Sequence, residues 1–258
     1  MRLISVNRLD AAIDNLVAAT AASRSDPVRR ELVRVLSICT VSDRQAAVLI
    51  PLFEDPSTGQ VHVVLTRRST GLATHSGEVC LPGGRRDPED FDDAATAVRE
   101  AEEELGISPA SVRVLGCLPP LLSKHRLSVR PVLAAIPPDL PFVPNPAEVE
   151  SVFAAPLSMF VEPPVGCHRH KDHAWEEGFP FRVHFFKHAH RGSEYVIWGL
   201  TAGILIEAAQ IAFARDAAFP VSVPHAPPYA SLVFRGGRLA FDAGREDGVM
   251  RAWQMGDS

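Results

Sequence analysis

Short apolar runs, several of them bounded by turn residues, recur along this chain and predict strands mixed with helices. Residues 46–53 and 61–66 are rich in branched apolar side chains and flank a turn at 55–59, so they predict a β-hairpin. Similar runs predict further strands at 112–118, 128–136, 150–154, 182–188 and 231–234. Capped or periodic apolar segments predict helices at 9–17, 29–36, 156–160 and 198–214. Elements in this order predict an α/β sandwich around a mixed sheet.

Changes in composition divide the chain into three predicted parts. Residues 1–44 predict a helical N-terminal extension. Residues 45–215 contain most of the strands and the long apolar helix, and we expect them to form the main domain. Residues 216–258 are rich in proline, glycine and charged residues, which predicts an irregular C-terminal tail.

Residues 99–107 carry the most informative pattern in the chain. They read Arg-Glu-Ala-Glu-Glu-Glu-Leu-Gly-Ile, so Glu100, Glu103 and Glu104 stand at i, i+3 and i+4 on one face of a predicted helix. Like charges at this spacing repel by about 0.2–0.5 kcal/mol per pair. A bound Mg²⁺ or Mn²⁺ would offset the repulsion, because hard divalent cations bind carboxylate oxygens as well as phosphate oxygens.

The surroundings of this acidic helix favour a ligand site, although a charge run alone usually indicates a solvated helix face. Asp92 and Asp93 suit the positive end of the helix dipole, and Gly106 suits a left-handed C-terminal cap. Upstream, Gly83 and Gly84 allow the backbone to approach a phosphate closely. The opposite helix face carries residues that can pack on a core, namely Ala94, Val98, Ala101 and Leu105.

The segment from Arg99 to Ile107 resembles the second half of the Nudix box, G-x5-E-x7-R-E-U-x-E-E-x-G-U, in which U is an aliphatic residue. The first half departs from the box. Asp90 follows Gly84 at the spacing of the box, but eight residues then separate it from Arg99, where the box has seven. Counting back from Arg99 puts Phe91 at the first acidic position, so that position has no assigned residue.

Two segments before the box point to one branch of the Nudix hydrolases. Residues 64–69 and 77–84 resemble the signature that precedes the box in coenzyme A pyrophosphatases, and the similarity, to plant members in particular, extends over about 46–213. Ala73 stands where that signature has an arginine, which can change substrate choice. The resemblance implies a Nudix-type α/β/α sandwich that cleaves coenzyme A or acyl-coenzyme A. The alternatives are another nucleoside diphosphate derivative (NADH, ADP-ribose or an oxidised nucleotide) and a catalytically idle nucleotide-binding module.

The same resemblance implies roles for residues of the box. Glu100, Glu103 and Glu104 would bind Mg²⁺, with Mn²⁺ as a substitute, and Glu103 would be a third ligand or the general base. Arg99 would orient these glutamates through ion pairs. These four residues are the predicted catalytic set.

Binding of the substrate is assigned to residues upstream of the box. Gly83 and Gly84 would bring backbone groups close to the metal and the phosphates. Arg67 and Arg68 are candidates for binding an anionic group, and the alternative is that they are surface arginines.

Other residues permit a functional interpretation that the sequence does not favour. His168, His170 and His173 lie close together, but their spacing matches no standard zinc module and predicts a surface loop. His125 is a candidate general base, with a polar loop residue as the alternative. Glu148 or Glu150 could direct one carboxylate toward the metals, although an exposed strand edge fits equally well.

Bulk properties narrow the partners and the location. The 258 residues carry a formal net charge of −5, which argues against a general nucleic-acid binder. No apolar run is long enough to span a membrane. The four cysteines form no metal or disulfide pattern, the N-terminus does not resemble a signal peptide, and the C-terminus is no peroxisomal signal. We therefore expect a cytoplasmic protein with a small-molecule substrate, with mitochondria as the alternative location.

Overall fold

A computed structural model of the protein describes residues 8–25, 42, 44–71, 76–175, 178–226, 232–235 and 238–241. Its main sheet has the strand order β3-β2-β1-β7-β5, with β4 paired to β1, β6 to β7 and β8 to β2. Strands β1 and β7 run parallel, and the other pairs are antiparallel. The strands are β1 (Gln45–Asp55), β2 (Gln60–Arg68), β3 (Val79–Cys80), β4 (Gly83–Arg85), β5 (Arg113–Cys117), β6 (Leu121–Leu122), β7 (Ser128–Ala135) and β8 (Val149–Pro156).

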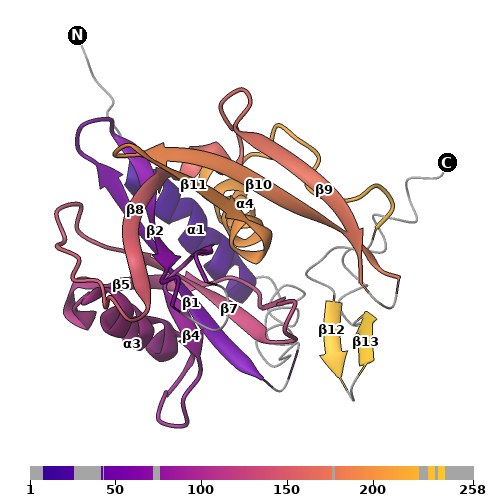
Figure 1. The fold of residues 1–258 in the computed structure, drawn as a ribbon, viewed down its shortest axis with the longest axis horizontal. Coiled ribbons are helices and arrows are strands. Elements are labelled where there is room, and N and C mark those ends of the chain that lie inside the picture. Colours follow the sequence, from indigo (N-terminus) through magenta and orange to yellow (C-terminus); the bar gives the residue numbers. More distant parts are fainter. Residues whose placement is uncertain are drawn as a thin grey trace.

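Helices cover both faces of this sheet (Figure 1). Side chains of β1 alternate between the faces, as in any strand buried on both sides. Ala47 and Leu49 pack with the buried side of α3 (Asp93–Leu105), whereas Ile50 and Leu52 belong to the cluster that contains α1 (Arg8–Ser25) and α4 (Gly199–Phe213). The main sheet therefore holds α3 on one side and the pair α1 and α4 on the other.

A second sheet extends beside α4 (Figure 1). It has the order β11-β10-β9, and β11 leads directly into α4. Its strands are β9 (His168–Ala174), β10 (Pro180–His190) and β11 (Ser193–Trp198), and a separate pair is formed by β12 (Leu232–Arg235) and β13 (Arg238–Phe241). Short 3₁₀ helices occur at η1 (Pro109–Ser111) and η2 (Leu157–Phe160). None of the helices in the described ranges is long and apolar enough to cross a membrane.

The structure confirms the predicted α/β sandwich and most of the predicted elements. The first hairpin, the acidic helix, the strand at 182–188 and the long apolar helix all form, with ends shifted by a few residues. The residues around His168 are mostly exposed, as predicted, but the prediction of a loop is wrong, because they form β9 and pair with β10. The predicted helix at 29–36 lies outside the described residues, and the division of the chain at 44 and 215 stays a prediction.

Candidate active site

Helix α3 is held in one rotational setting by its caps and its buried face. The Asp92 carboxylate accepts a hydrogen bond from the Ala95 amide at 2.8 Å, and Gly106 closes the helix with φ 65°. Ala97, Ala101 and Leu105 are fully buried against the sheet. The predicted apolar face is therefore the packed face, which turns the glutamates toward the start of β4.

Glu104 is a buried carboxylate, and its neighbours offset little of the cost of burying its negative charge. Its side chain is 2% exposed, its Oε1 lies 3.5 Å from Nη1 of Arg68, and its Oε2 accepts a 3.4 Å hydrogen bond from the Gly83 amide. Burial raises the pKa of Glu104 to about 8, although the charge of Arg68 opposes this. In the described part of the chain, the buried Nε of Arg68 also lacks a hydrogen-bond partner. Both groups fit a site that is completed by a cation and an anion.

Glu100 lies directly over Gly84, which together with Gly83 begins strand β4 rather than forming a turn. A Cβ built on Gly84 would come within 2.4 Å of Oε1 of Glu100, so only glycine leaves room for this carboxylate. Gly83 has φ +152°, and a Cβ there would meet the Ala47 carbonyl oxygen at 2.3 Å. Burial also raises the pKa of Glu100, with Arg99 acting against it. Gly84 therefore lets the Glu100 carboxylate approach the backbone of β4 closely, while the predicted approach of this backbone to a metal and phosphates stays a prediction.

Arg99 forms hydrogen bonds with acidic residues of α3 and of the loop before it. Its Nη1 donates to Oε1 of Glu100 at 3.2 Å and to Oε2 of Glu103 at 3.0 Å. Nε and Nη2 bind the two carboxylate oxygens of Asp90 at 3.0 Å each, and Nη2 also donates to the Arg85 carbonyl. Asp90 holds the pKa of Arg99 above its usual value. The side chain of Glu103 is 55% exposed, so it reaches solvent while Arg99 orients it.

Asp90 occupies the place that residue counting gave to Phe91. The hydrogen bonds from Arg99 lower the pKa of Asp90 despite its burial, and Thr96 donates a further hydrogen bond to Oδ2 at 2.9 Å. Phe91 is 90% exposed. The additional residue before Arg99 is therefore accommodated in the loop that precedes α3, and the acid is retained.

Glu148 is a further acidic residue near the site, and the sequence could not choose it over Glu150. The negative charge of Glu148 contributes to the raised pKa of both Glu100 and Glu104. The carboxylate of Glu150 instead lies 3.6 Å from Nη1 of Arg67. The choice between Glu148 and Glu150 depends on the fold. The loop before β8 returns to the end of α3, where the Asn145 amide donates a hydrogen bond to the Glu104 carbonyl.

Carboxylate oxygens are thus the donors available to a metal ion. In the described ranges, no three acidic, histidine or cysteine side chains already form a ready-made coordination cluster. Glu100 and Glu104 nonetheless face the adjacent residues Gly84 and Gly83, and burial, with a smaller contribution from the negative charge of Glu148, raises the pKa of each. Mg²⁺ and Mn²⁺ prefer oxygen ligands, and either ion fits carboxylates whose negative charge the neighbouring groups do not fully balance.

The two arginines predicted to bind an anion have different surroundings. Arg68 contacts Glu104 and lines the site. Arg67 donates to the Glu194 carbonyl at 2.6 Å and stacks over the Tyr195 ring at 4.3 Å. Arg67 therefore connects β2 with β11, whereas Arg68 is available near the glutamates.

The histidines of β9 form a pair with the neighbouring strand. Nε2 of His168 lies 3.0 Å from Nδ1 of His184 on β10, and Nε2 of His184 lies 2.9 Å from the Val221 carbonyl oxygen. Burial lowers the pKa of His168 to about 4. These contacts join β9, β10 and the segment after α4, and no metal cluster of three side chains forms within the described residues.

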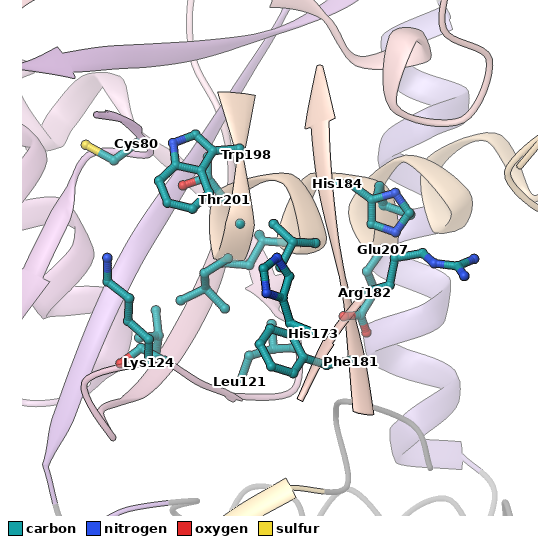
Figure 2. A pocket seen from close by; sticks show the side chains of 18 of the residues that line it. Cys80, Leu121, Lys124, His173, Phe181, Arg182, His184, Trp198, Thr201 and Glu207 are labelled. Atoms are coloured by element: carbon teal, nitrogen blue, oxygen red, sulfur yellow. The ribbon is translucent and has the colours of Figure 1, made fainter. Parts of the chain in front are cut away.

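A cavity of about 1350 Å³ begins at Gly83 and Gly84 of β4 and extends between the two sheets. Gly83, Gly84 and Arg68 line one part of it, and α4 and β10 form the wall elsewhere. Figure 2 shows Lys124, Trp198 and Cys80 in one region and His184, Arg182 and Glu207 in another, with His173 and Phe181 between them. His125 also lines this cavity. Sequence reasoning missed it because its walls come from segments far apart in the chain.

Comparison with known proteins gives consistent matches. The family model described as "NUDIX domain" matches residues 43–182. "Nudix hydrolase 15, mitochondrial" from Arabidopsis thaliana is 47% identical over 183 residues, which are 70% of this chain and 63% of that protein. "Uncharacterized Nudix hydrolase NudL" from Escherichia coli (strain K12) is 41% identical over 66% of this chain and 83% of that protein.

The chain spans less than two thirds of the length of the plant relatives, since it also covers only 60% of "Nudix hydrolase 22, chloroplastic" from Arabidopsis thaliana. Among solved structures, a MutT/nudix family protein from Enterococcus faecalis has a TM-score of 0.42 and 15% identity. That match covers 80% of this chain and 74% of the other.

Proposed function

Since this chain belongs to the NUDIX domain family, we propose that it hydrolyses the diphosphate bond of coenzyme A or of its thioesters. The products would be adenosine 3′,5′-bisphosphate and 4′-phosphopantetheine or its acyl derivative. One observation carries the choice of substrate. The cavity is lined by Arg68 and most of residues 78–84, which come from the two segments that resemble the coenzyme A pyrophosphatase signature. Of these residues, Arg68, Gly83 and Gly84 also approach the carboxylates of Glu104 or Glu100.

The charge of the site supports a phosphoanhydride substrate. Two negatively charged phosphates repel an attacking water or hydroxide, so catalysis requires neutralisation and positioning. Arg68 offers a guanidinium with a buried, unpartnered Nε–H in the described part of the chain, and it contacts the same Glu104 carboxylate as the Gly83 amide. Arg68 would bind a phosphate oxygen, and Gly83 and Gly84 would let the diphosphate approach the carboxylates.

The metal ion belongs to this proposal because the acidic residues fit it. Glu100 and Glu104 would hold Mg²⁺ or Mn²⁺, with Glu103 or Glu148 as a further ligand. When bound, the ion supplies positive charge for the phosphates and lowers the pKa of an attacking water. Arg99 fixes the directions of Glu100 and Glu103 through its hydrogen bonds.

Proton transfer would fall to Glu103. Its carboxylate is half-exposed and can exchange protons with solvent, unlike the buried Glu104. It would accept a proton from the water that attacks phosphorus, while the bond from phosphorus to the bridging oxygen breaks and the second phosphate leaves. One water is consumed for each diphosphate cleaved.

The size of the cavity supports a substrate that extends beyond its diphosphate. Ligand pockets usually have volumes of about 300–1,000 Å³, and this cavity exceeds that range. Basic side chains also predominate in its wall, namely Arg68, Arg85, Lys124, Arg126, Arg169, Lys171 and Arg182, against Glu78 and Glu207. A polyanion with a long substituent fits a cavity of this kind.

The test compares three substrates at equal concentrations of Mg²⁺ or Mn²⁺. We expect coenzyme A to give a kcat/KM at least tenfold higher than ADP-ribose and NADH, with adenosine 3′,5′-bisphosphate identified as a product by chromatography. A preference for ADP-ribose or NADH would contradict the proposal. It would then favour another nucleoside diphosphate derivative, as the alanine at position 73 allows. Lack of hydrolysis of all three would favour a nucleotide-binding module.

For the cellular location we propose the cytoplasm, with mitochondria as the alternative. The alternative is supported by the Arabidopsis thaliana relative that is named as a mitochondrial Nudix hydrolase. Fractionation of cells that express the full-length protein, with markers for both compartments, distinguishes the two.

A further inference from the structure

One stripe of α4 faces the cavity over most of the length of the helix. Gly199, Gly203, Glu207 and Gln210 follow one another at intervals of four, four and three residues, which places them on one side of a helix. All four line the cavity. From Gly199 to Gln210 the helix rises by about 16 Å, so the cavity continues well beyond the diphosphate site.

Gly203 leaves open space in the middle of this stripe. It is exposed although it lies within α4, and a Cβ built on it would meet no atom within 4 Å. Its φ lies outside the left-handed region, so other residues can adopt its backbone conformation. Glycine is one of the least favourable residues in a helix interior. No backbone strain requires glycine at position 203. We therefore explain Gly203 by the space that its missing side chain leaves in the cavity.

Glu207, one turn further along, places a carboxyl group in the same cavity. Burial alone raises its pKa to about 7. No hydrogen bond or ion pair reaches this carboxyl from the described residues. Arg182 is bound to Asp172 through two hydrogen bonds of 2.6 and 2.8 Å, and His184 is occupied by His168 and the Val221 carbonyl. The neighbouring cation and imidazole in Figure 2 are thus engaged elsewhere.

The wall around Glu207 limits what could bind to it. A neutral carboxyl group both donates and accepts hydrogen bonds, which complements an amide. An ionised Glu207 would repel an anion, and the apolar side chains Leu121, Phe181 and Ile204 line the same cavity. The buried indole Nε1–H of Trp175, also in the wall, lacks an acceptor in the described part of the chain. An uncharged chain with amide groups satisfies these features.

We propose that this cavity binds the pantetheine arm of the substrate, with Gly203 giving the arm its room and Glu207 hydrogen-bonding one of its amides. This inference rests on the proposed function, because it specifies where the part of coenzyme A beyond the diphosphate lies. Glu207 and Gly203 are then specificity determinants that act far from the glutamates of α3. They bind the arm and take no part in proton transfer.

The first experiment fills the space with a side chain. Gly203→Phe is compared with Gly203→Ala, which adds one methyl group and keeps the arm's path open. The probe is pantetheine itself, which has no diphosphate and is not hydrolysed, observed by saturation-transfer NMR on the full chain. We expect its signal with the wild type and Gly203→Ala, and at least a fivefold loss with Gly203→Phe. No signal with the wild type, or an equal signal with Gly203→Phe, overturns the proposal.

A second pair of variants keeps the proposal testable if Gly203→Phe does not fold. Glu207→Gln retains a donor and an acceptor, whereas Glu207→Leu removes both. We expect KM for coenzyme A to rise at least tenfold in Glu207→Leu and less than threefold in Glu207→Gln, with kcat/KM for ADP-ribose changed less than twofold in both. Equal KM values for coenzyme A in the two variants contradict the inference.

Different results would contradict the proposed arm site and the proposed function. If the wild type cleaves coenzyme A but pantetheine binding does not respond to position 203, the arm site is wrong and the proposed function stands. If no coenzyme A is cleaved, the proposed function is wrong whatever the NMR result, and the arm site then falls with it as a substrate site.

Discussion

The Arg99 guanidinium binds the Asp90 carboxylate through two parallel hydrogen bonds, each 3.0 Å long. This paired geometry holds the planar guanidinium so that Nη1 faces Glu100 and Glu103. The loop before α3 therefore determines the orientation of acidic residues that lie about two to three helical turns after the start of α3. The role of Asp90 is to position Arg99, since Asp90 contacts none of the reacting groups we propose.

Asp90→Asn should lower both stability and turnover. It breaks a largely buried ion pair, which costs about 3 kcal/mol, and it leaves Arg99 free to turn away from Glu100. Phe91→Ala is the matched control, because the exposed Phe91 is the residue that sequence counting put in the acidic position. Urea unfolding and kcat measure the two effects. Equal losses in the two variants would show that Asp90 does not position the site.

The ion pair between Asp90 and Arg99 should also make the free energy of unfolding of the wild type depend on pH in acid. The pKa of Asp90 is lowered in the folded protein, so its stabilising contribution is present above its ordinary pKa of 3.8 and is lost as the pH falls below it. Asp90→Asn removes this contribution. We expect the free energies of unfolding of wild type and Asp90→Asn to differ by a constant amount above about pH 5 and to converge as the pH falls from about 4 toward 2.

Glu104→Gln should reduce kcat at least about 100-fold without loss of stability, because a ligand that supplies several kcal/mol to the transition state is removed. Glutamine is tolerated at this buried position because burial already disfavours the charged carboxylate. Glu102→Gln is the control, since Glu102 lies on the exposed side of the same helix. Near-normal turnover by Glu104→Gln would contradict the assignment of Glu104 as a ligand.

Glu207 should make the protein less stable at alkaline pH. Its pKa is raised from 4.5 to about 7, so the native state binds the proton more tightly than the unfolded state does. Stability therefore falls as the pH rises from about 5 to 8. Glu207→Gln should match the wild type near pH 5 and exceed its free energy of unfolding by up to about 3 kcal/mol at pH 8.5. A constant difference across this range would show that Glu207 does not titrate as described.

A chelator should abolish activity without unfolding the protein. Excess EDTA removes Mg²⁺ or Mn²⁺, and the sandwich around β1 does not depend on either ion for its core. We expect hydrolysis to stop while far-ultraviolet circular dichroism stays unchanged, and excess Mg²⁺ to restore the rate. Full activity in EDTA would place the enzyme outside this scheme.

The sequence predicted those features that local chemistry determines. The apolar face of α3 and its Gly106 cap follow from the spacing of a few residues, and the structure reproduces both. Strand β9 was missed because it reads His-Arg-His-Lys-Asp-His-Ala and is stabilised by pairing with β10 rather than by an apolar pattern.

Other features depend on contacts between distant segments and left no local signal. Glu148 approaches Glu100 and Glu104 because the loop before β8 returns to α3. Counting residues back from Arg99 pointed to Phe91, but Arg99 binds Asp90, because the loop before α3 accommodates one additional residue. The cavity has walls from β1, β10 and α4, so its depth could not be predicted from any single pattern.

The most direct test of the central claim is a crystal of the full-length protein soaked in Mn²⁺ and measured at a wavelength that gives anomalous signal from manganese. The account predicts an anomalous peak beside Gly84, coordinated by carboxylate oxygens of Glu100 and Glu104. The metal assignment would be contradicted by well-ordered density for Gly83 and Gly84 without an anomalous peak, with the carboxylates of Glu100 and Glu104 directed away from each other.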